Sequence, residues 1–599
     1  MKLSRLSAMI PLVLVATAHA QDPKAAPPPA TTISLFPKGY HSHEALGTAL
    51  KKLASEHSDL VQVSALGQSL EQREILLARV GRAEKEREPR RPAVLVVGNL
   101  EGDHVVGSEI ALRLIERLAA RGREDAEING MLDQWTFYVI PRLNPDGAER
   151  VLGGPARLDF RGNLRPLDRD RDGRAAEDHP NDVDGDGFVL TMRVKDDHAT
   201  LIADEKEPRW LKSAEIAKSQ QPVYSLYREG VDDDGDGLID EDALSGVNLN
   251  RNWPQKWPEF DPEAGYSPGG EPETRALIRF VVDHPEIVAL VGYGLADTIS
   301  NEPKKPASTL DDADLPFFVE LSRNLAARTK EANKQPGQPV SNGANNTTAK
   351  PVAATTARAG RPTKPGSAST AIPGLEASLD GSLAEWAYQQ LGMVSVGVRL
   401  WSTPEFPEPA EGQPKPPTEA EARWLRWNDE AAGGQAFVAF KTFQHPTLGE
   451  VEIGGWKPGV RVNPPSERLG PIADSQLVFL KDVTSRLPRL EMNDARVTPR
   501  GEGVFEVVVS VSNAGTFPTA LAQGLKSRSA APVVVRLRAP DARILVGKPV
   551  SKIANLRGLG GREELRWLIQ APKELQAIEV EAGAPRAGFV RKSLSLKPM

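Results

Sequence analysis

The sequence predicts an α/β fold built on an open sheet, followed by an all-β domain toward the C-terminal end. An apolar run at 93–97, a helix with one apolar face at 110–119 and a second apolar run at 135–141 form a β-α-β succession. From about residue 488, short alternating segments separated by Gly, Asn and Pro turns replace this pattern. Ligands of open α/β sheets bind at the carboxyl ends of the strands, so we expect the functional residues in the turns that follow them.

The composition limits the classes of function. A chain of 599 residues is too long for one core, so we expect two or three domains. The net charge of −7 argues against general nucleic-acid binding and gives no attraction to an anionic membrane surface. No cysteine is present, which excludes disulfides, thiolate metal ligands and a lipidated cysteine. No stretch is long and apolar enough to span a bilayer, so we expect no integral membrane contact.

Residues 1–20 have the pattern of a secretory signal peptide. A basic start precedes an apolar run over 8–16, and small residues at 18–20 form a cleavage motif. We therefore expect an exported protein, either periplasmic or extracellular. The Pro/Ala-rich segment 21–32 is predicted to be mobile.

In the predicted α/β domain, each early element follows from its apolar spacing. Residues 41–57 form a helix, and 60–66 and 75–80 form strands around a polar turn. The next strand ends in a Gly/Asn/Asp turn that carries Glu101 and His104, three residues apart. A carboxylate and an imidazole are both zinc ligands, so one metal ion is a candidate here; a pair of solvated turn residues is the alternative.

The most specific motif is Gly-Val-Asn-Leu-Asn-Arg-Asn-Trp at 246–253. Together with Asn-Pro-Asp-Gly at 144–147 and the turn around Glu101, it resembles the M14 zinc carboxypeptidases. The resemblance covers about 33–470 and implies an M14-like domain at 33–475. It also implies a mixed central sheet with helices on both faces, a zinc site at the strand ends, and recognition of the C-terminal carboxylate of a peptide.

The resemblance assigns the residues that contact substrate. Asn250 and Arg251 match the pair that holds the terminal carboxylate, and Arg suits this task because its guanidinium offers a bidentate fork. Phe-Arg-Gly-Asn at 160–163 resembles the segment whose arginine polarises the scissile carbonyl, so Arg161 is the candidate for that role and for substrate binding. An ordinary surface arginine is the alternative for Arg161. The expected partners are the C-termini of protein or cell-wall peptides.

The catalytic positions depart from the family pattern. The family turn has the order His-x-x-Glu, which Glu101 and His104 exchange. The third zinc ligand is a His at the end of a later strand, where the alignment places Val291; Asp297 lies just beyond. The general-base position holds Arg399, and a guanidinium cannot accept a proton. These departures predict weak zinc binding and impaired catalysis.

An acidic insert at 164–245 contains three segments in which Asp alternates with other residues before a Gly. This pattern matches the first half of a calcium loop, because calcium prefers several carboxylate oxygens. The predicted ligands are Asp168, Asp170, Asp172 and Glu177; Asp182, Asp184 and Asp186; and Asp232, Asp234, Asp236 and Glu241. The complete EF-hand spacing is absent, and a solvated acidic loop is the alternative. Bound calcium would order the insert.

Two further segments lack chemical motifs. Residues 334–373 are rich in Pro, Ala, Thr and Gly, which predicts a disordered insert. Residues 485–599 have the strand and turn pattern of a β-sandwich, which we interpret as a packing or attachment module.

Three functions remain open. The first is an exported M14-family protein that recognises peptide C-termini and is catalytically impaired. The second is an active zinc carboxypeptidase with a rearranged site, which requires a third ligand close to Glu101 and His104, such as Asp297. The third is a calcium-ordered adhesion or scaffold protein with a vestigial pocket, in which Asn250 and Arg251 are occluded or paired with internal acids. The sequence does not determine whether the chain is an enzyme, or its oligomeric state.

Overall fold

The computed structural model describes residues 33–84, 89–154, 157–168, 173–175, 178–213, 222–235, 239, 246–332, 340–341, 378–406 and 417–597. Several predicted features lie outside the described residues: the signal peptide 1–20, the segment 21–32, the insert 334–373 apart from 340–341, and the candidate calcium ligands Asp170, Asp172, Glu177, Asp236 and Glu241. All described elements belong to one compact unit, 33–599.

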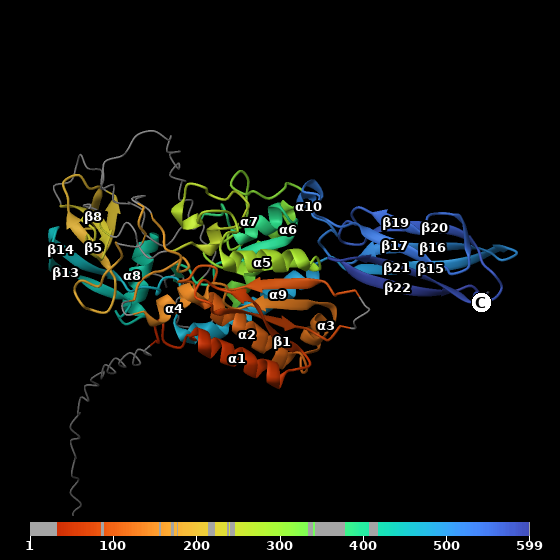
Figure 1. The fold of residues 1–599 in the computed structure, drawn as a ribbon, viewed down its shortest axis with the longest axis horizontal. Helices are drawn as coiled ribbons and strands as arrows, with labels where there is room; N and C mark the ends of the chain where they lie inside the picture. Colours follow the sequence, from red (N-terminus) through yellow and green to blue (C-terminus); the bar gives the residue numbers. More distant parts are fainter. Residues whose placement is uncertain are drawn as a thin grey trace, which may run out of the picture. The chain divides into compact units, whose positions relative to one another are not determined.

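Six strands form the central sheet in the order β1-β2-β4-β3-β9-β11 (Figure 1). Their bounds are β1 Val61–Gln68, β2 Glu74–Val80, β3 Ala93–Val97, β4 Thr136–Ile140, β9 Ile287–Tyr293 and β11 Val394–Val398. The pairs β1–β2 and β2–β4 are antiparallel, whereas β3–β4, β3–β9 and β9–β11 are parallel. The sheet is therefore mixed, as predicted, and the carboxyl ends of β3, β9 and β11 meet at one edge.

Helices cover both faces of this sheet, which confirms the predicted fold class. One face packs against α1 His43–Glu56, α2 Val106–Arg121, α3 Ala126–Gln134, α6 Leu315–Ala332 and α9 Leu469–Arg486. The other face packs against α5 Pro272–Asp283, α7 Leu383–Gln389 and the short helix η2 Leu249–Arg251. Residue 475, where we expected the α/β domain to end, lies inside α9, and α9 packs on α2.

The acidic insert contributes strands to a second sheet, which sequence reasoning did not predict. Its order is β13-β14-β5-β8-β6-β7. The bounds are β5 Thr191–Lys195, β6 Leu201–Ala203, β7 Leu211–Ser213, β8 Val223–Arg228, β13 Phe437–His445 and β14 Gly449–Trp456. β14 pairs with β5, and Met192 and Ile453 are buried in a shared apolar core. The insert is thus joined to a hairpin from much later in the chain.

The remaining elements of the first domain are short or peripheral. They are α4 Pro145–Gly153, η3 Pro262–Ala264, β10 Val340–Ser341, β12 Pro404–Glu405, α8 Ala420–Glu430 and η4 Ser466–Arg468. α4 begins at the Asn-Pro-Asp-Gly motif because the Asn144 side chain accepts a hydrogen bond from the Gly147 amide and Pro145 occupies the first turn.

The C-terminal region is a β-sandwich, as predicted. One sheet has the order β15-β16-β20-β18 and the other β19-β17-β21-β22. The bounds are β15 Leu490–Gly501, β16 Val504–Asn513, α10 Ala522–Lys526, β17 Val533–Arg538, β18 Arg543–Val546, β19 Val550–Ile553, β20 Gly561–Gln570, β21 Ala577–Ala584 and β22 Gly588–Ser595. Alternate residues such as Val507, Val535 and Ile569 meet in one core between the sheets.

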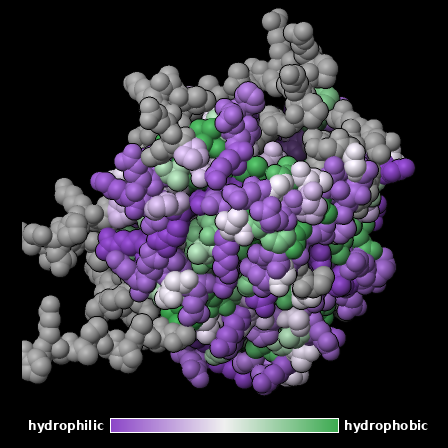
Figure 2. Space-filling view, turned by 90° about the vertical axis from the view of Figure 1, so that its left-hand side faces the viewer, coloured by the Kyte–Doolittle hydropathy of each residue, from purple (hydrophilic) through white to green (hydrophobic). Residues whose placement is uncertain are grey.

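The surface is mainly polar in the view of Figure 2, with smaller hydrophobic areas between hydrophilic side chains. Among the described residues, no helix combines the length and the apolar character needed to cross a membrane.

Candidate functional site

The turn after β3 places Glu101 and His104 at the carboxyl end of the central sheet. Asn99 has a φ of 56°, a left-handed conformation that Asn tolerates, and its side-chain amide donates to the Glu101 carbonyl at 2.8 Å. Asn463 closes the turn: it donates to the Asp103 carbonyl and accepts from the first amide of α2, each at 2.8 Å. Sequence reasoning missed Asn463 because no motif marks it.

Glu101 is bound by the chain itself. Its side chain is 1% exposed, and Oε1 accepts hydrogen bonds from the Asn250 side-chain amide at 2.8 Å and the Leu295 amide at 3.2 Å. Oε2 is buried and has no hydrogen-bond partner among the described residues. Burial raises the pKa of Glu101, and the hydrogen bond from Asn250 opposes that shift.

His104 is fully buried. Neither ring nitrogen has a hydrogen-bond partner in the described part of the chain. Burial and the nearby Arg399 cation lower the pKa of His104 to about 3. A Cβ placed on Gly107 would lie 3.3 Å from His104 Nδ1 and 3.3 Å from Tyr293 Cβ, so Tyr293 is the residue of β9 beside this ring.

Val291, which the motif alignment places at the third ligand position, lies within β9. Val291 is paired with Val96 inside the sheet and lies in the apolar core, two residues before β9 ends at Tyr293. Tyr293 is itself buried, and burial raises the pKa of its phenol.

Asp297 does not complete a metal site. Its carboxylate accepts hydrogen bonds from the amides of Ile299, Ser300 and Arg399 at 2.9, 2.8 and 3.2 Å, so it organises its own turn. Among the described residues, the group of His, Asp or Glu side chains close enough to share an ion lies elsewhere, in the acidic insert. A catalytic zinc centre uses three protein ligands, and here Glu101 and His104 supply two at most. Among the described residues, Glu101 and His104 therefore do not form a group of three such side chains.

Arg399 and Arg161 bring positive charge to this site. Arg399 follows β11 and is largely buried; burial lowers its pKa, while the carboxylates of Asp297 and Glu101 favour its charged form. Arg161 Nε lies 3.8 Å from Asp103 Oδ2, and Arg161 Nη2 is buried without a hydrogen-bond partner among the described residues. Burial raises the pKa of Asp103 to about 7, with Arg161 opposing the shift.

Arg161 and Asp103 line a cavity of about 220 Å³. Its other charged residues are Asp159, Arg228, Glu263, Lys457 and Arg461. Lys457 and Arg461 follow β14 of the second sheet, so the joined insert and hairpin supply one wall of the cavity. The cavity lining therefore contains both cations and carboxylates. The buried nitrogen that has no hydrogen-bond partner among the described residues is Nη2 of Arg161.

The predicted carboxylate-binding pair contacts internal acids. Asn250 is 4% exposed, donates to Glu101 and accepts from the Leu383 amide at 3.1 Å. Arg251 Nη2 forms an ion pair with Asp261, and both side chains are partly exposed. This is the arrangement that the scaffold hypothesis predicts for the pair.

The acidic insert brings one of its three loops against a buried glutamate. Asp182 Oδ1 accepts from the amides of Gly185 and Asp186 at 2.8 and 3.0 Å, as expected for a tightly turned loop. Asp182, Asp184 and Glu229 lie close enough for one oxygen of each to share an ion. Glu229, at the end of β8, is fully buried and was missed because nothing in its sequence neighbourhood marks a ligand.

Among the other predicted calcium residues that the structure describes, Asp168, Asp186 and Asp232 accept hydrogen bonds from nearby backbone amides. Asp168 Oδ2 accepts from the Gly173 amide at 3.1 Å, and Asp232 Oδ1 accepts from the Gly235 amide at 2.6 Å. Asp186 accepts from the Phe188 amide at 2.9 Å. Asp234 is described but belongs to no group of three close acids among the described residues.

Comparisons with known proteins agree with the motifs. The zinc carboxypeptidase family model matches residues 46–422, more than half of the chain, and a domain family of unknown function matches 489–595. Mouse (Mus musculus) Carboxypeptidase M is 34% identical over 112 residues, which cover 19% of this chain and 25% of that protein. Mouse Carboxypeptidase D is 31% identical over 132 residues, which cover 21% of this chain and 10% of that protein.

The matched segments thus span a quarter or less of the length of these two relatives. Among solved structures, thrombin activatable fibrinolysis inhibitor matches with 12% identity and a TM-score of 0.38, covering 74% of each chain. On the match to the family model, the chain belongs to the zinc carboxypeptidase family.

Proposed function

We propose that this chain recognises the C-terminal carboxylate of a protein or cell-wall peptide and that its hydrolytic chemistry is impaired. The observation that supports recognition is the Arg161 guanidinium, whose buried Nη2 has no hydrogen-bond partner among the described residues. A buried donor without a partner costs free energy, and a ligand carboxylate would satisfy it. Arg228, Lys457 and Arg461 add positive charge around the same cavity.

Arg161 suits a carboxylate because a guanidinium donates two parallel hydrogen bonds to it, and charge-assisted bonds are stronger than neutral ones. The nearest internal acid, Asp103, lies 3.8 Å away, beyond hydrogen-bond distance. Its raised pKa, about 7, means that it competes weakly for Arg161 below neutral pH. The ligand carboxylate would therefore bind without displacing a strong internal ion pair.

Two arguments support impaired hydrolysis. The motif alignment places Arg399 at the general-base position, and a guanidinium cannot take a proton from water. Glu101 and His104 do not gain a third described ligand, and one oxygen of Glu101 already accepts from Asn250. A site of this kind holds a peptide terminus without activating water.

The test compares peptides of one sequence with a free or an amidated C-terminus, using calorimetry on the purified full chain. We expect about tenfold tighter binding of the free acid, and loss of that preference in Arg161→Gln, because a charge-assisted pair contributes about that much. Arg543→Gln, an exposed arginine in the β-sandwich, is the matched control. Equal affinity for both peptides would refute recognition. About one zinc per chain together with release of the C-terminal residue would favour an active, rearranged carboxypeptidase instead.

A second candidate is the scaffold protein, favoured by the internal pairs Asn250–Glu101 and Arg251–Asp261. In this candidate, calcium bound by Asp182, Asp184 and Glu229 orders the insert and the second sheet. The measurement is the melting temperature with calcium and with a chelator, in the native chain and in Glu229→Gln. Calcium stabilisation without any preference for free C-termini would select the scaffold, whereas an unchanged melting temperature would remove calcium from the proposal.

Export completes the proposal and rests on the N-terminal pattern alone. A signal peptide at 1–20 predicts that protein recovered from the periplasm or medium begins at Gln21. N-terminal sequencing of that material is the measurement, and a mature chain that retains 1–20 would contradict it.

A further inference from the structure

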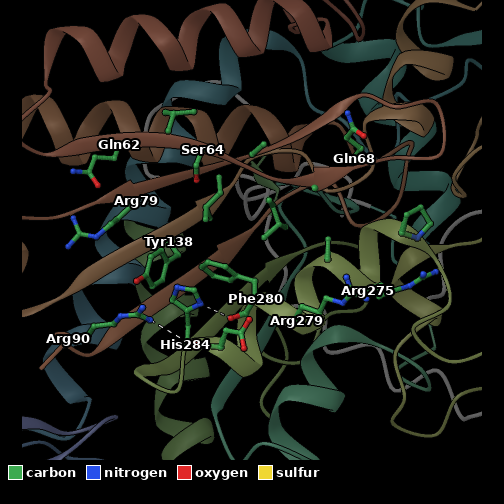
Figure 3. A pocket seen from close by; sticks show the side chains of 18 of the residues that line it. Gln62, Ser64, Gln68, Arg79, Arg90, Tyr138, Arg275, Arg279, Phe280 and His284 are labelled. Carbon is green, nitrogen blue, oxygen red and sulfur yellow. Dashed lines mark hydrogen bonds between the residues drawn. The ribbon is translucent and has the colours of Figure 1, made fainter. Parts of the chain in front are cut away.

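A groove of about 920 Å³ lies between β1 and α5 and shares no residue with the Glu101 site (Figure 3). Side chains of β1, β2 and β4, among them Leu77 and Tyr138, line it together with residues of α5. The two walls meet where a Cβ on Gly67 would lie 3.0 Å from Ala276 Cβ. Glycine at this position lets the strand and the helix approach closely, which closes that part of the groove.

The strand wall of the groove is a sheet face formed by β1, β2 and β4, and it extends to the edge strand of the sheet. β1 is the terminal strand of the central sheet, and no described strand pairs with its outer side. Seven consecutive residues, 62–68, line the groove, so it follows the strand along its length. Gln62, Ser64 and Gln68 are exposed. Unpaired backbone groups along a strand edge can accept another extended chain through main-chain hydrogen bonds.

The helix wall carries arginines that the chain does not neutralise. Arg275 and Arg279 are both exposed on α5. Arg275 donates to the Gly270 carbonyl at 2.5 Å, and Arg279 has no hydrogen bond or ion pair within the described ranges. Asp283 is the acid on the same wall, so the helix side has one more cation than anion.

The far part of the groove adds two arginines that already have partners. Arg79 lies 3.5 Å from Glu84, and Arg90 lies 3.2 Å from the buried Glu286. Figure 3 shows Arg79 and Arg90 on the same side of the view as Tyr138 and His284. The groove is therefore cationic overall, although the whole chain has a net charge of −7. A cationic surface on an acidic protein indicates an acidic ligand.

The spacing of Arg275 and Arg279 favours an extended ligand. Residues four apart on an α-helix are separated by about 6 Å along its axis. Alternate residues of an extended strand are separated by about 6.6 Å and point to the same side. A peptide with acids at every second position can therefore place one carboxylate opposite Arg275 and the next opposite Arg279.

We propose that this groove binds an extended acidic segment of a partner protein, which adds to β1 as a further strand. Main-chain hydrogen bonds to the edge of β1 supply affinity, and alternate Asp or Glu side chains pair with Arg275 and Arg279. The inference does not depend on the peptide-terminus site, because the two sites share no residues.

The experiment uses the full chain and a short fluorescein-labelled peptide in which Glu and Thr alternate. Its C-terminus is amidated, so that the proposed carboxylate site is not engaged. A block peptide, with all Glu before all Thr, controls for charge, and an alternately N-methylated peptide controls for main-chain hydrogen bonding. The protein variants are Arg275→Gln/Arg279→Gln and the charge-matched control Arg543→Gln/Arg562→Gln, both exposed residues of the β-sandwich.

We expect fluorescence anisotropy to show binding of the alternating peptide, with affinity about tenfold lower for the groove variant, because each exposed ion pair contributes about threefold. The control variant, the block peptide and the N-methylated peptide separate this site from general charge attraction. Equal binding of alternating and block peptides would overturn the proposal, as would an equal loss in both variants. Binding that survives N-methylation would overturn the added-strand geometry.

Discussion

Replacing Glu273 by Gln should remove a pH-dependent loss of stability. Glu273 lies in the first turn of α5 and is fully buried. Its oxygens accept long hydrogen bonds from the Leu70 amide and the Asn163 side chain, each at 3.4 Å. Burial, together with the carboxylates of Glu271 and Asp146, raises the pKa of Glu273 to about 7. The native fold therefore keeps this carboxyl protonated more readily than the unfolded chain does.

The sign of the effect follows from proton linkage. Below the ordinary pKa of 4.5, this carboxyl is protonated in both the native and the unfolded chain. Its titration therefore does not change the free energy of unfolding there. As the pH rises from there toward about 7, the unfolded chain gains from ionisation and the native chain does not. At about 1.4 kcal/mol per pH unit, the native chain loses about 3 kcal/mol by pH 8. Gln cannot ionise, so Glu273→Gln escapes this loss.

Melting temperatures of native and variant chains, measured across this pH range, test the reasoning. Groups that do not interact with Glu273 titrate alike in both proteins, so the difference reports Glu273 together with its coupling to Glu271 and Asp146. We expect similar melting temperatures near pH 4 and a variant more stable by several degrees near pH 8. Glu44→Gln, an exposed residue of α1, controls for loss of a carboxyl. A difference that stays constant with pH, or a variant less stable at high pH, would refute the argument.

Two other substitutions test the framework of the site. Gly246→Ala should abolish stable folding, because φ is 55° and a Cβ would lie 1.5 Å from the Asn163 carbonyl oxygen. Gly433→Ala has a similar φ of 60° but its nearest neighbour is 3.7 Å away, so we expect a loss of only about 1 kcal/mol by chemical denaturation. Asn463→Ala should cost about 2–3 kcal/mol, because the buried Val106 amide loses its acceptor; hydrogen exchange faster at that amide than in the rest of α2 is the check.

The central sheet could be predicted because its signals are local. The apolar run at 93–97 coincides with β3, since every residue of that strand is buried. The helix predicted at 110–119 is longer, from Val106 to Arg121. Its first turn contains Gly107, which composition assigns to a loop; a Cβ there would lie 2.7 Å from the Asn99 amide nitrogen. A tertiary contact therefore determines where this helix begins, and the intrinsic helix propensity of its first residues does not.

The second sheet could not be predicted because the strands that pair in it are far apart in the sequence. β5 and β14 pair across more than two hundred and fifty residues, for example Met192 with Ile453. Alternation identifies a strand but carries no information about which strand lies beside it. The same limit applies to Asn463 and Glu229, whose roles depend on segments brought together only by the fold.

The motifs located the candidate site, but its chemistry depends on contacts that motifs do not encode. In a zinc centre, the metal supplies positive charge to a buried carboxylate. At the buried Glu101, Asn250 donates a hydrogen bond, and the Arg399 and Arg161 cations lie nearby. The charges at 101 and 399 are therefore coupled. Asp297 and Glu101 both favour the charged form of Arg399, which offsets part of the cost of burying a guanidinium there.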